Sequence, residues 1–349
     1  MSLDLETRTM MLESADRLLR DLCTPELINR AEQGEFPAAL WQALQEAGLT
    51  LVAVPEEQGG VGGSLADFAA VLRLLGFHAA PVPAAETALA RYLAAHAALA
   101  LPDEPVSVAI GQSPLQLSGD SRKISGDVRS VPWPSHAVVA PARAADGKAW
   151  LVVLKAAPVA TANNQAGEPR GRFNVADVPV AAAKPLALSF EDIWALAAFM
   201  RVQQMAGAGQ RVLEIALDYA RERKQFGRPI GNFQAVQQLL AELSGQVASL
   251  QSAAESAGDA AALGNLGFPV AAAKVRAGEA AGRIAAMAHQ VLGAMGFTYE
   301  HRLHHFTRRL WVWRDDYGSD GFWAGTIGRS ITAAGADALW PQLSGLANK

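Results

Sequence analysis

Cysteine, charge and long apolar runs are all scarce in this sequence. Its 349 residues include one cysteine, Cys23, which excludes an intramolecular disulfide and fits a reducing compartment. Only 18% of the residues are charged and the formal net charge is −4, without a sustained basic tract, so nucleic acid is not an expected partner. The first twenty residues carry charges among their apolar positions, unlike a signal peptide. No stretch reaches the ~18 uncharged apolar residues of a membrane span. We therefore expect a globular cytoplasmic protein.

The first hundred residues have a mostly helical pattern. Residues 49–54 (LTLVAV) end at a proline, and this short apolar run predicts a buried extended segment. Ser64 followed three positions later by Asp67 is a capping-box pattern, which predicts that a helix begins there.

The pattern changes near Pro102. Short segments rich in β-branched residues follow at 106–110, 137–140, 150–154 and 173–180, with glycine-containing turn signals between them. They predict a small antiparallel β domain.

Helices return after this region. Ser189 with Asp192 is a second capping-box pattern and opens a long predicted helix, while Pro269 suits the first position of a later one. A final pair of helices is expected over 303–313 and 322–340. Long helices with short breaks favour a four-helix bundle. The order of helices, strands and helices argues against a doubly wound nucleotide fold, in which the two alternate.

Three segments carry distinctive motifs. The first lies in residues 40–60, with GL at 48–49, VPEE at 54–57 and GG at 59–60. The second is residues 221–230 (RERKQFGRPI), and the third is residues 290–298 (QVLGAMGFT). Their sequences, order and spacing resemble those of the acyl-CoA dehydrogenase family over nearly the whole chain.

The resemblance implies FAD as cofactor, held at a boundary between subunits. In the family, the arginine and phenylalanine of R-x-x-F-G reach the flavin dinucleotide of a neighbouring subunit, so Arg223, Gln225 and Phe226 would hold its pyrophosphate or adenine end. The planar, permanently charged guanidinium suits phosphate oxygens. The alternative is that Arg223 and Lys224 only complement a helix C-terminus that Gly227 caps.

The third motif resembles the family's Q-x-x-G-G-x-G helix end. Gln290, Gly293 and Gly296 match it, with Ala294 at the position of the second glycine, and small residues there let a dinucleotide approach the backbone.

The resemblance also implies the architecture and the partners. We expect an α+β fold with an N-terminal α-helical domain (1–103), a central antiparallel β barrel (104–184) and a C-terminal four-helix bundle (185–349). The implied substrate is an acyl-CoA, the implied electron acceptor is an electron-transfer flavoprotein, and the implied assembly is a homo- or hetero-oligomer, either a dimer or a tetramer.

The expected catalytic base is where the sequence departs from the family. Most members use the glutamate of a Y-E-G-T motif, and residues 313–319 (WRDDYGS) place Tyr317 at that position. A phenol with an ordinary pKa of about 10 is a poor base near neutral pH. The alternative position on the long helix falls on Ala197, beside Ala198. Asp316 is the remaining candidate base, with Asp315 before it. The competing reading is that both aspartates are solvated, or paired with nearby arginines of residues 308–314.

The predicted β domain departs as well. Residues 109–112 and 130–133 stand where the family has its TEPgaGSD and W-I-T contacts to flavin and thioester, and neither motif is present. Trp133 is either a stacking partner for the isoalloxazine or ordinary packing.

Three functions therefore stay open. The first is an FAD-dependent acyl-CoA dehydrogenase, or a subunit of one, that desaturates an acyl thioester in lipid metabolism. The second is a non-catalytic subunit that completes the flavin site of another chain. The third is a flavin-free CoA-thioester binder.

His301, His304 and His305 have a spacing that some metal sites use. No cysteine or HExxH-type glutamate accompanies them, so we predict no metal site, with surface or interface histidines as the expectation.

Overall fold

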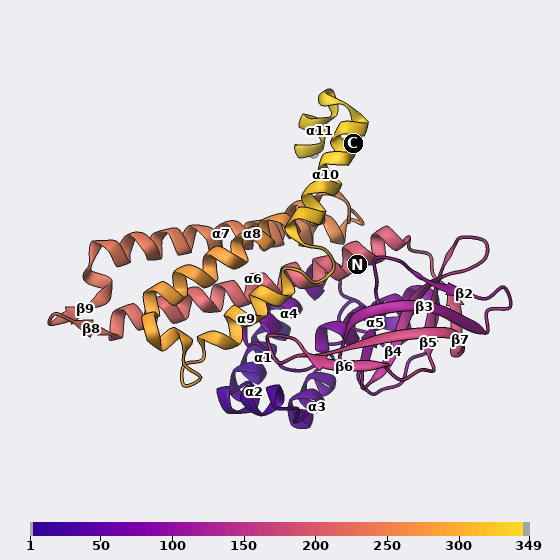
Figure 1. Cartoon of the computed structure of the whole chain (residues 1–349), viewed down its shortest axis with the longest axis horizontal. Coiled ribbons are helices and arrows are strands. Elements are labelled where there is room, and N and C mark those ends of the chain that lie inside the picture. Colours follow the sequence, from indigo (N-terminus) through magenta and orange to yellow (C-terminus); the bar gives the residue numbers. More distant parts are fainter. Residues whose placement is uncertain (1–2, 345–349) are drawn as a thin grey trace.

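The computed structural model describes residues 3–344 and arranges them as helices, a β-sheet and a second group of helices (Figure 1). The N-terminal helices are α1 (Leu5–Leu22), α2 (Pro25–Glu32), α3 (Ala38–Glu46), the 3₁₀ helix η1 (Glu56–Gln58), α4 (Leu65–Phe77) and α5 (Ala84–Ala97). The predicted capping box forms, with the Ser64 and Asp67 side chains each accepting from the other's backbone N–H, and α4 begins at the next residue.

The prediction of an extended segment at 49–54 is wrong. These residues form turns, in which the N–H of Leu51 donates to Gly48 O and that of Val54 donates to Leu51 O. Val52 and Val54 are buried all the same. The apolar run therefore indicates burial and not a strand, because turns and the loop at 61–63 satisfy its backbone groups.

The central region is a seven-stranded sheet. Its strands are β1 (Val106–Val108), β2 (Leu115–Leu117), β3 (Lys123–Pro132), β4 (Ala137–Arg143), β5 (Ala149–Leu154), β6 (Ala160–Asn163) and β7 (Pro169–Pro185). The pairings β4–β2–β3–β7–β5–β4 follow a closed path, and β6 pairs with β7. Because β4 runs parallel to both β1 and β2, the sheet is mixed, whereas the sequence led us to expect an antiparallel one.

The remaining helices build the C-terminal bundle. They are α6 (Phe190–Glu222), α7 (Gln234–Ala262), α8 (Phe268–Leu292), α9 (Leu303–Trp313), α10 (Asp320–Ala334) and α11 (Leu339–Leu343), with the 3₁₀ helices η2 (Ile230–Asn232), η3 (Gly293–Phe297) and η4 (Ala336–Ala338) and the hairpin β8 (Lys224–Gln225) and β9 (Arg228–Pro229). Ser189 and Asp192 form the predicted capping box before α6, and Pro269 lies in the first turn of α8, as predicted.

Two glycines bring α4 against α6. A Cβ added at Gly207 would lie 1.9 Å from the carbonyl oxygen of Arg73, and one added at Gly76 would lie 2.0 Å from that of Gln204. Glycine is required at both positions because the two backbones touch there. This contact fixes the N-terminal helices against the middle of α6.

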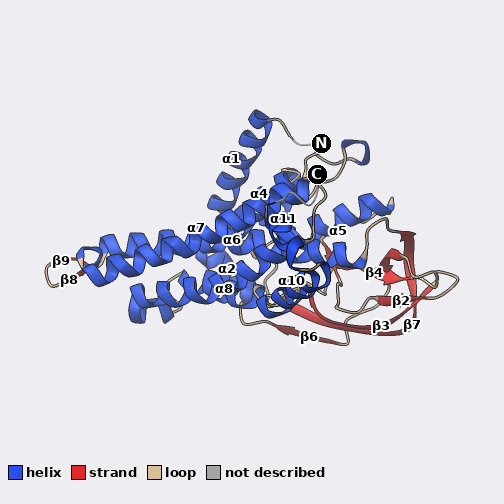
Figure 2. Ribbon diagram, turned by 90° about the horizontal axis from the view of Figure 1, so that it is seen from above, coloured by secondary structure: helices blue, strands red, loops and turns tan. Residues whose placement is uncertain are grey.

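The bundle is elongated, and the two views agree on its ends (Figures 1 and 2). The β8–β9 hairpin and the turn after α8 lie at one end, and the sheet lies beyond the other. In the described part of the chain, no helix is both long enough and apolar enough to span a bilayer.

Candidate functional site

A cavity of about 940 Å³ lies where the sheet meets the bundle. Its walls come from the β1–β2 loop (110–113), β3, the β6–β7 loop (163–165), the start of α6 and the turn between α9 and α10 (315–319). Residues 109–112 and 130–133, which stand in place of the family's flavin and thioester contacts, both contribute to the wall through Ile110, Gly111, Gln112 and Ser130. Trp133 is not among the lining residues, so the cavity offers no support for its stacking role.

Asp316 lines this cavity but is held by two arginines. Its Oδ2 accepts from Arg170 Nη2 at 3.0 Å and from Arg201 Nε at 2.9 Å, and its side chain is 18% exposed. Burial alone would raise the pKa of Asp316, but the charges of Arg170 and Arg201 outweigh it and hold this pKa below its usual range. A carboxylate with a lowered pKa is a weak proton acceptor. Its partners come from β7 and α6, and not from residues 308–314.

Arg201 is the centre of this arrangement. Its side chain is 2% exposed, and its guanidinium also donates to Glu86 Oε1 at 2.8 Å and to Gln204 Oε1 at 2.6 Å. Burial alone would lower the pKa of Arg201. The negative charges of Glu86 and Asp316 outweigh this effect, so the pKa of Arg201 lies above its usual range. The arginine therefore stays charged and ties α5 and the α9–α10 turn to α6.

Tyr317 is the residue that the motif in the sequence aligns with the family's catalytic glutamate. It lines the cavity with a backbone φ of +56°, and its ring lies 5.8 Å from the Arg201 guanidinium. Burial raises the pKa of the phenol well above its usual value. Tyr317 is thus protonated at neutral pH and cannot serve as the base. Ala197 and Ala198, at the alternative position, are fully buried.

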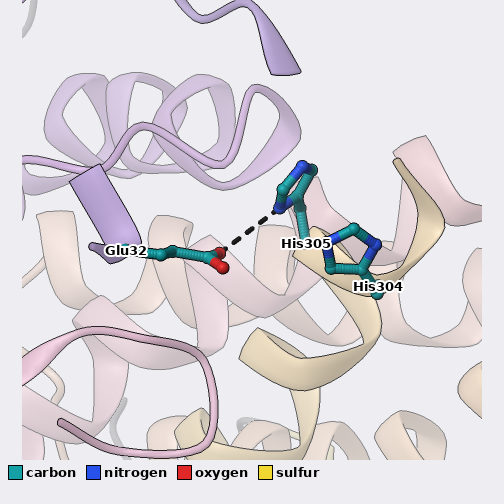
Figure 3. A group of neighbouring side chains, drawn as sticks. All are labelled: Glu32, His304 and His305. Carbon is teal, nitrogen blue, oxygen red and sulfur yellow. Dashed lines mark hydrogen bonds and ion pairs between the residues drawn. The ribbon is translucent and has the colours of Figure 1, made fainter. Parts of the chain in front are cut away.

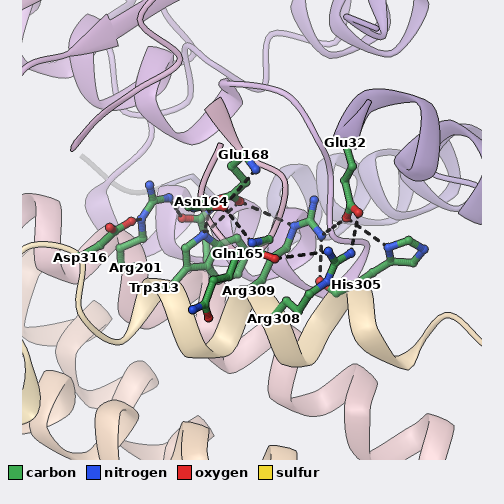
Figure 4. A network of polar contacts seen from close by, with 12 residues as sticks. Glu32, Asn164, Gln165, Glu168, Arg201, His305, Arg308, Arg309, Trp313 and Asp316 are labelled. Atoms are coloured by element: carbon green, nitrogen blue, oxygen red, sulfur yellow. Dashed lines mark hydrogen bonds and ion pairs between the residues drawn. The ribbon is translucent and has the colours of Figure 1, made fainter. Parts of the chain in front are cut away.

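The ion pairs continue from the cavity to the N-terminal helices (Figure 4). Glu168 accepts from Arg170 at 3.0 Å and from Trp313 Nε1 at 3.1 Å, and lies 3.7 Å from Arg309 Nε. Arg309 in turn donates to Glu32 at 3.4 Å. The network therefore connects α2, α5, the sheet, α6 and α9.

Sequence reasoning missed the acids and arginines that carry this network, namely Glu32, Glu86, Glu168, Arg170 and Arg201. One signal was available. Arg201 is a lone charge inside an apolar helical run (195–208), and a charge at such a position needs a buried partner. The partners themselves had no local signal.

Glu32, His304 and His305 form the group of described residues that could hold a cation, with one candidate ligand atom from each lying within 4.8 Å of the others (Figure 3). The glutamate was not part of the histidine pattern in the sequence, and His301 is not part of the group. Burial lowers the pKa of both histidines, that of His304 to about 4. However, Glu32 also pairs with Arg308 and with Arg309. Two guanidinium groups on one carboxylate oppose a metal ion, so the contacts describe an ion-pair cluster.

The residues matched to cofactor binding lie elsewhere. Arg223, Gln225 and Phe226 follow α6 at the β8–β9 hairpin, and all three are exposed, Phe226 to 92%. Gln290 lies in the last turn of α8 and is also exposed. These positions share one end of the bundle with the turn after α8, away from the sheet (Figures 1 and 2).

Gly293 and Ala294 lie in that turn, in η3, and are exposed as well. A Cβ added at Gly293 would meet no atom within 4 Å, and its φ is +60°. None of the six matched residues lines the large cavity. All six are therefore exposed and lie at the same end of the bundle, and we call this group the bundle end (Arg223, Gln225, Phe226, Gln290, Gly293 and Ala294).

Comparison with protein families identifies two domains in this chain. Residues 6–100 match the acyl-CoA dehydrogenase N-terminal domain and residues 195–332 match the acyl-CoA dehydrogenase C-terminal domain.

Similar proteins point the same way. The acyl-CoA dehydrogenase IpdE2 of Mycobacterium tuberculosis is 30% identical over 311 residues, which are 87% of this chain and 91% of IpdE2. Acyl-CoA dehydrogenase FadE34 of the same organism is 32% identical over 87% of this chain, but the match covers only 44% of FadE34.

Solved structures share the fold. A chain of the ChsE4–ChsE5 complex from M. tuberculosis superposes with a TM-score of 0.84 at 26% identity, covering 95% of this chain and 98% of that one. A chain of the Tcur3481–Tcur3483 steroid ACAD superposes with a TM-score of 0.86 at 24% identity, covering 94% and 98%. From the two domain matches and the full-length relatives, the chain belongs to the acyl-CoA dehydrogenase family.

Proposed function

We propose that this chain is a subunit of an FAD-dependent acyl-CoA dehydrogenase and lends its bundle end to a flavin site shared with another subunit. This proposal rests on the separation between the residues matched to cofactor binding and the chain's own cavity. The residues that match the family's dinucleotide motifs are exposed at one end of the bundle, and none of them lines the chain's own cavity. Residues placed in this way are suited to a cofactor that a neighbouring subunit brings to them. The ChsE4–ChsE5 complex is a relative of this fold that is built from two different chains.

The bundle end fits the dinucleotide part of FAD. Arg223 offers an exposed guanidinium for phosphate oxygens, Phe226 offers an exposed ring, and Gly293 leaves the backbone open to close approach. Arg223, Gln225 and Phe226 would hold one side of the cofactor, and Gln290, Gly293 and Ala294 the other. When bound, FAD supplies the hydride acceptor for α,β-desaturation of an acyl thioester.

The side chains of the chain's own cavity favour an assembly in which a partner subunit supplies the catalytic base. Desaturation needs a carboxylate close to the α carbon, with a free lone pair. Arg170 and Arg201 pair with Oδ2 of Asp316 and lower the pKa of this carboxylate, Tyr317 is a protonated phenol, and Asp127 is paired with Arg172. Asp315 lines the cavity as well, but its side chain is 68% exposed and lies 3.9 Å from Arg314. In the proposed assembly the proton is removed by a companion subunit, and an electron-transfer flavoprotein accepts the electrons.

A second candidate is a self-sufficient dehydrogenase in which Asp316 is the base. The observation in its favour is that Asp316 lines the cavity and keeps 18% of its side chain exposed. In this version Oδ1, which takes part in neither arginine contact, would accept the proton. A flavin-free thioester binder is the third candidate, and the missing β-domain motifs favour it.

Flavin content separates these candidates. The visible absorption spectrum of the purified chain should show little bound flavin, with or without added FAD. The companion would be identified by isolating the tagged chain from its native host, and the two chains would then be expressed together. We expect that complex to retain FAD and to bleach with an acyl-CoA, and the Arg223→Ala variant of the complex to lose the flavin. A chain that alone holds stoichiometric FAD and reduces it with acyl-CoA would contradict the proposal.

A further inference from the structure

Residues 324–340, which we call the arm, project from the bundle (Figure 1). They comprise most of α10, all of η4 and the start of α11. Trp323 is buried just before the arm, and its Nε1 donates to Tyr317 O at 3.0 Å, which fixes the start of α10 to the body of the protein. No residue of the arm is fully buried. Helices in proteins are stabilised mainly by the packing of one face, and this arm receives little such packing from its own chain.

The arm is poor in charge for an exposed segment. Arg329 and Asp337 are its only charged residues. Its tip presents two large apolar side chains, with Leu339 exposed to 39% and Trp340 to 72%. Solvated helix faces normally carry charged and polar residues. An exposed helical arm with few charges and an apolar tip therefore indicates a surface that another protein chain covers.

One side of α10 carries no side chains of any size. Gly325 and Gly328 lie on the side of the helix opposite Trp323, because successive residues of a helix are rotated by roughly 100°. A Cβ added at Gly328 would meet no atom within 4 Å, and one added at Gly325 would meet only the end of the Arg329 side chain. Glycine weakens a helix relative to alanine, and the chain's own packing does not require it here. This bare side permits close approach by another chain.

The two halves of the arm are complementary to each other. The bare half carries Arg329, and the tip carries Asp337 beside Trp340. Arg329 donates to Thr326 of its own helix at 3.1 Å, and among the described residues neither Arg329 nor Asp337 has an ion-pair partner. In a two-fold contact, residue i of one copy meets residue j of the other, and the reverse. Two arms side by side in opposite directions, with the two-fold axis midway between these charges, bring each arginine to the aspartate of the other copy.

The exposed area of the chain is large enough for such a contact. The chain has an accessible surface of 15820 Å², whereas a compact monomer of 36.8 kDa exposes about 13,600 Å². The excess is greater than the ~800 Å² that each partner buries in a standard interface. The arm can therefore be covered in an assembly that also covers the bundle end.

We propose that two copies of this chain associate through their arms, with the tip of each arm on the bare side of the other and Arg329 paired with Asp337 of the other copy. The arm leaves the bundle near the sheet, whereas the β8–β9 hairpin lies at the far end (Figure 1). This contact is separate from the bundle end and goes beyond the proposed function, because it requires neither FAD nor a companion subunit.

Exchange of the two charges tests the contact, and sedimentation equilibrium of the full chain measures it. The wild-type chain should form a dimer in a concentration-dependent way. Arg329→Asp and Asp337→Arg should each raise the dissociation constant about tenfold or more, because symmetry then places two like-charged pairs in the contact. An equimolar mixture of these two variants should restore the dimer, since both pairs are again of opposite charge. Arg17→Asp is the matched control, because it makes the same charge change at an exposed position of α1 and should dimerise like the wild type.

Gly328→Leu tests the bare side of α10. The leucine side chain would occupy the space that the tip of the other copy needs, so the dissociation constant should again rise about tenfold or more. The melting temperature of the monomer, measured at low concentration, should not fall. Position 328 has room for a side chain in the single chain, and leucine favours a helix more than glycine does.

The alternatives give different results. A chain that stays monomeric at every concentration, or a mixture of the two charge variants that stays monomeric, would overturn the proposal. If the same variants instead release the companion subunit from the two-chain complex, the arm binds the companion and the contact between copies is wrong. The flavin content of the two-chain complex is an independent readout. A restored dimer without flavin retention would uphold this contact and contradict the proposed function, and the reverse result would do the opposite.

Discussion

Arg201 Nε lies 2.9 Å from Asp316 Oδ2, and this contact joins the middle of the longest helix to the turn that lines the cavity. On its other side Arg201 holds Glu86 at 2.8 Å. One guanidinium thus pairs with two carboxylates that lie 115 residues away from it along the chain, one in each direction. Asp316, the candidate base of the sequence analysis, is thus part of a network of ion pairs that joins distant parts of the fold.

Replacing Arg201 should destabilise the protein strongly. Arg201→Met leaves Glu86 and Asp316 without their shared partner, and an uncompensated buried charge costs about 3–5 kcal/mol in free energy of unfolding. Denaturant unfolding measures this loss. Arg221→Met is the control, because the Arg221–Asp218 pair is exposed and should contribute less than about 1 kcal/mol. A loss for Arg201→Met as small as that for Arg221→Met would show that the ion pair does not stabilise the fold.

Asp316→Asn tests whether this residue is a base. If Asp316 is structural, turnover of the reconstituted complex should fall no more than about twofold per folded molecule, whereas removal of a general base costs about 10²–10⁴-fold. Asp315→Asn in the neighbouring position is the control. A loss of turnover confined to Asp316→Asn, with the melting temperature preserved, would restore Asp316 as the base and refute our interpretation of the ion pair.

Local patterns in the sequence predicted much of this fold. The two capping boxes gave the starts of α4 and α6 to the residue, because a cap is formed by neighbours in sequence. The site was predictable only in part. Asp316 was found through the motif around it, but Arg170 and Arg201, its partners, lie 146 and 115 residues away. No local pattern specifies which distant charge a buried charge will meet.

The segment 49–54 shows a second limit of predicting structure from local sequence. A short apolar run predicts burial, and Val52 and Val54 are buried. Whether such a run pairs as a strand depends on whether an edge of a sheet lies beside it, and here its backbone groups bond in turns and with the loop at 61–63.

Lys274 should make stability increase with pH in the alkaline range. Its Nζ donates to the carbonyl oxygens of Arg314 at 2.6 Å and Gly318 at 2.7 Å, beneath the turn that lines the cavity. Burial lowers the pKa of Lys274 from 10.5 to about 8. Between these two values the unfolded chain binds more protons than the folded one, so the free energy of unfolding rises with pH.

Comparison with Lys274→Met isolates this effect. From pH 8 to pH 10 the wild-type protein should gain roughly 2 kcal/mol relative to Lys274→Met, because each pKa unit is worth about 1.4 kcal/mol. Denaturant unfolding at several pH values measures the difference. Parallel pH profiles for the two proteins would mean that Lys274 titrates normally in the folded state.

Phe226 should matter for assembly and not for the fold of the single chain. Its side chain is 92% exposed at the tip of the β8–β9 hairpin, where burial contributes nothing to the free energy of folding. Phe226→Ser should therefore change the stability of the isolated chain by less than about 0.5 kcal/mol. If the bundle end is a subunit interface, the same change should raise the dissociation constant of the subunit contact about tenfold or more, because aromatic anchors dominate interface free energies.

Leu263→Ser is the matched control. Leu263 is 87% exposed in the turn that follows α7, and this turn lies at the opposite end of that helix from the hairpin. Sedimentation velocity across a concentration series measures assembly for both variants. Weaker assembly in Phe226→Ser alone places the subunit contact at the bundle end, next to Arg223 and Gly293. Equal assembly in both variants would remove that surface from the interface, and the shared flavin site would lose its structural basis.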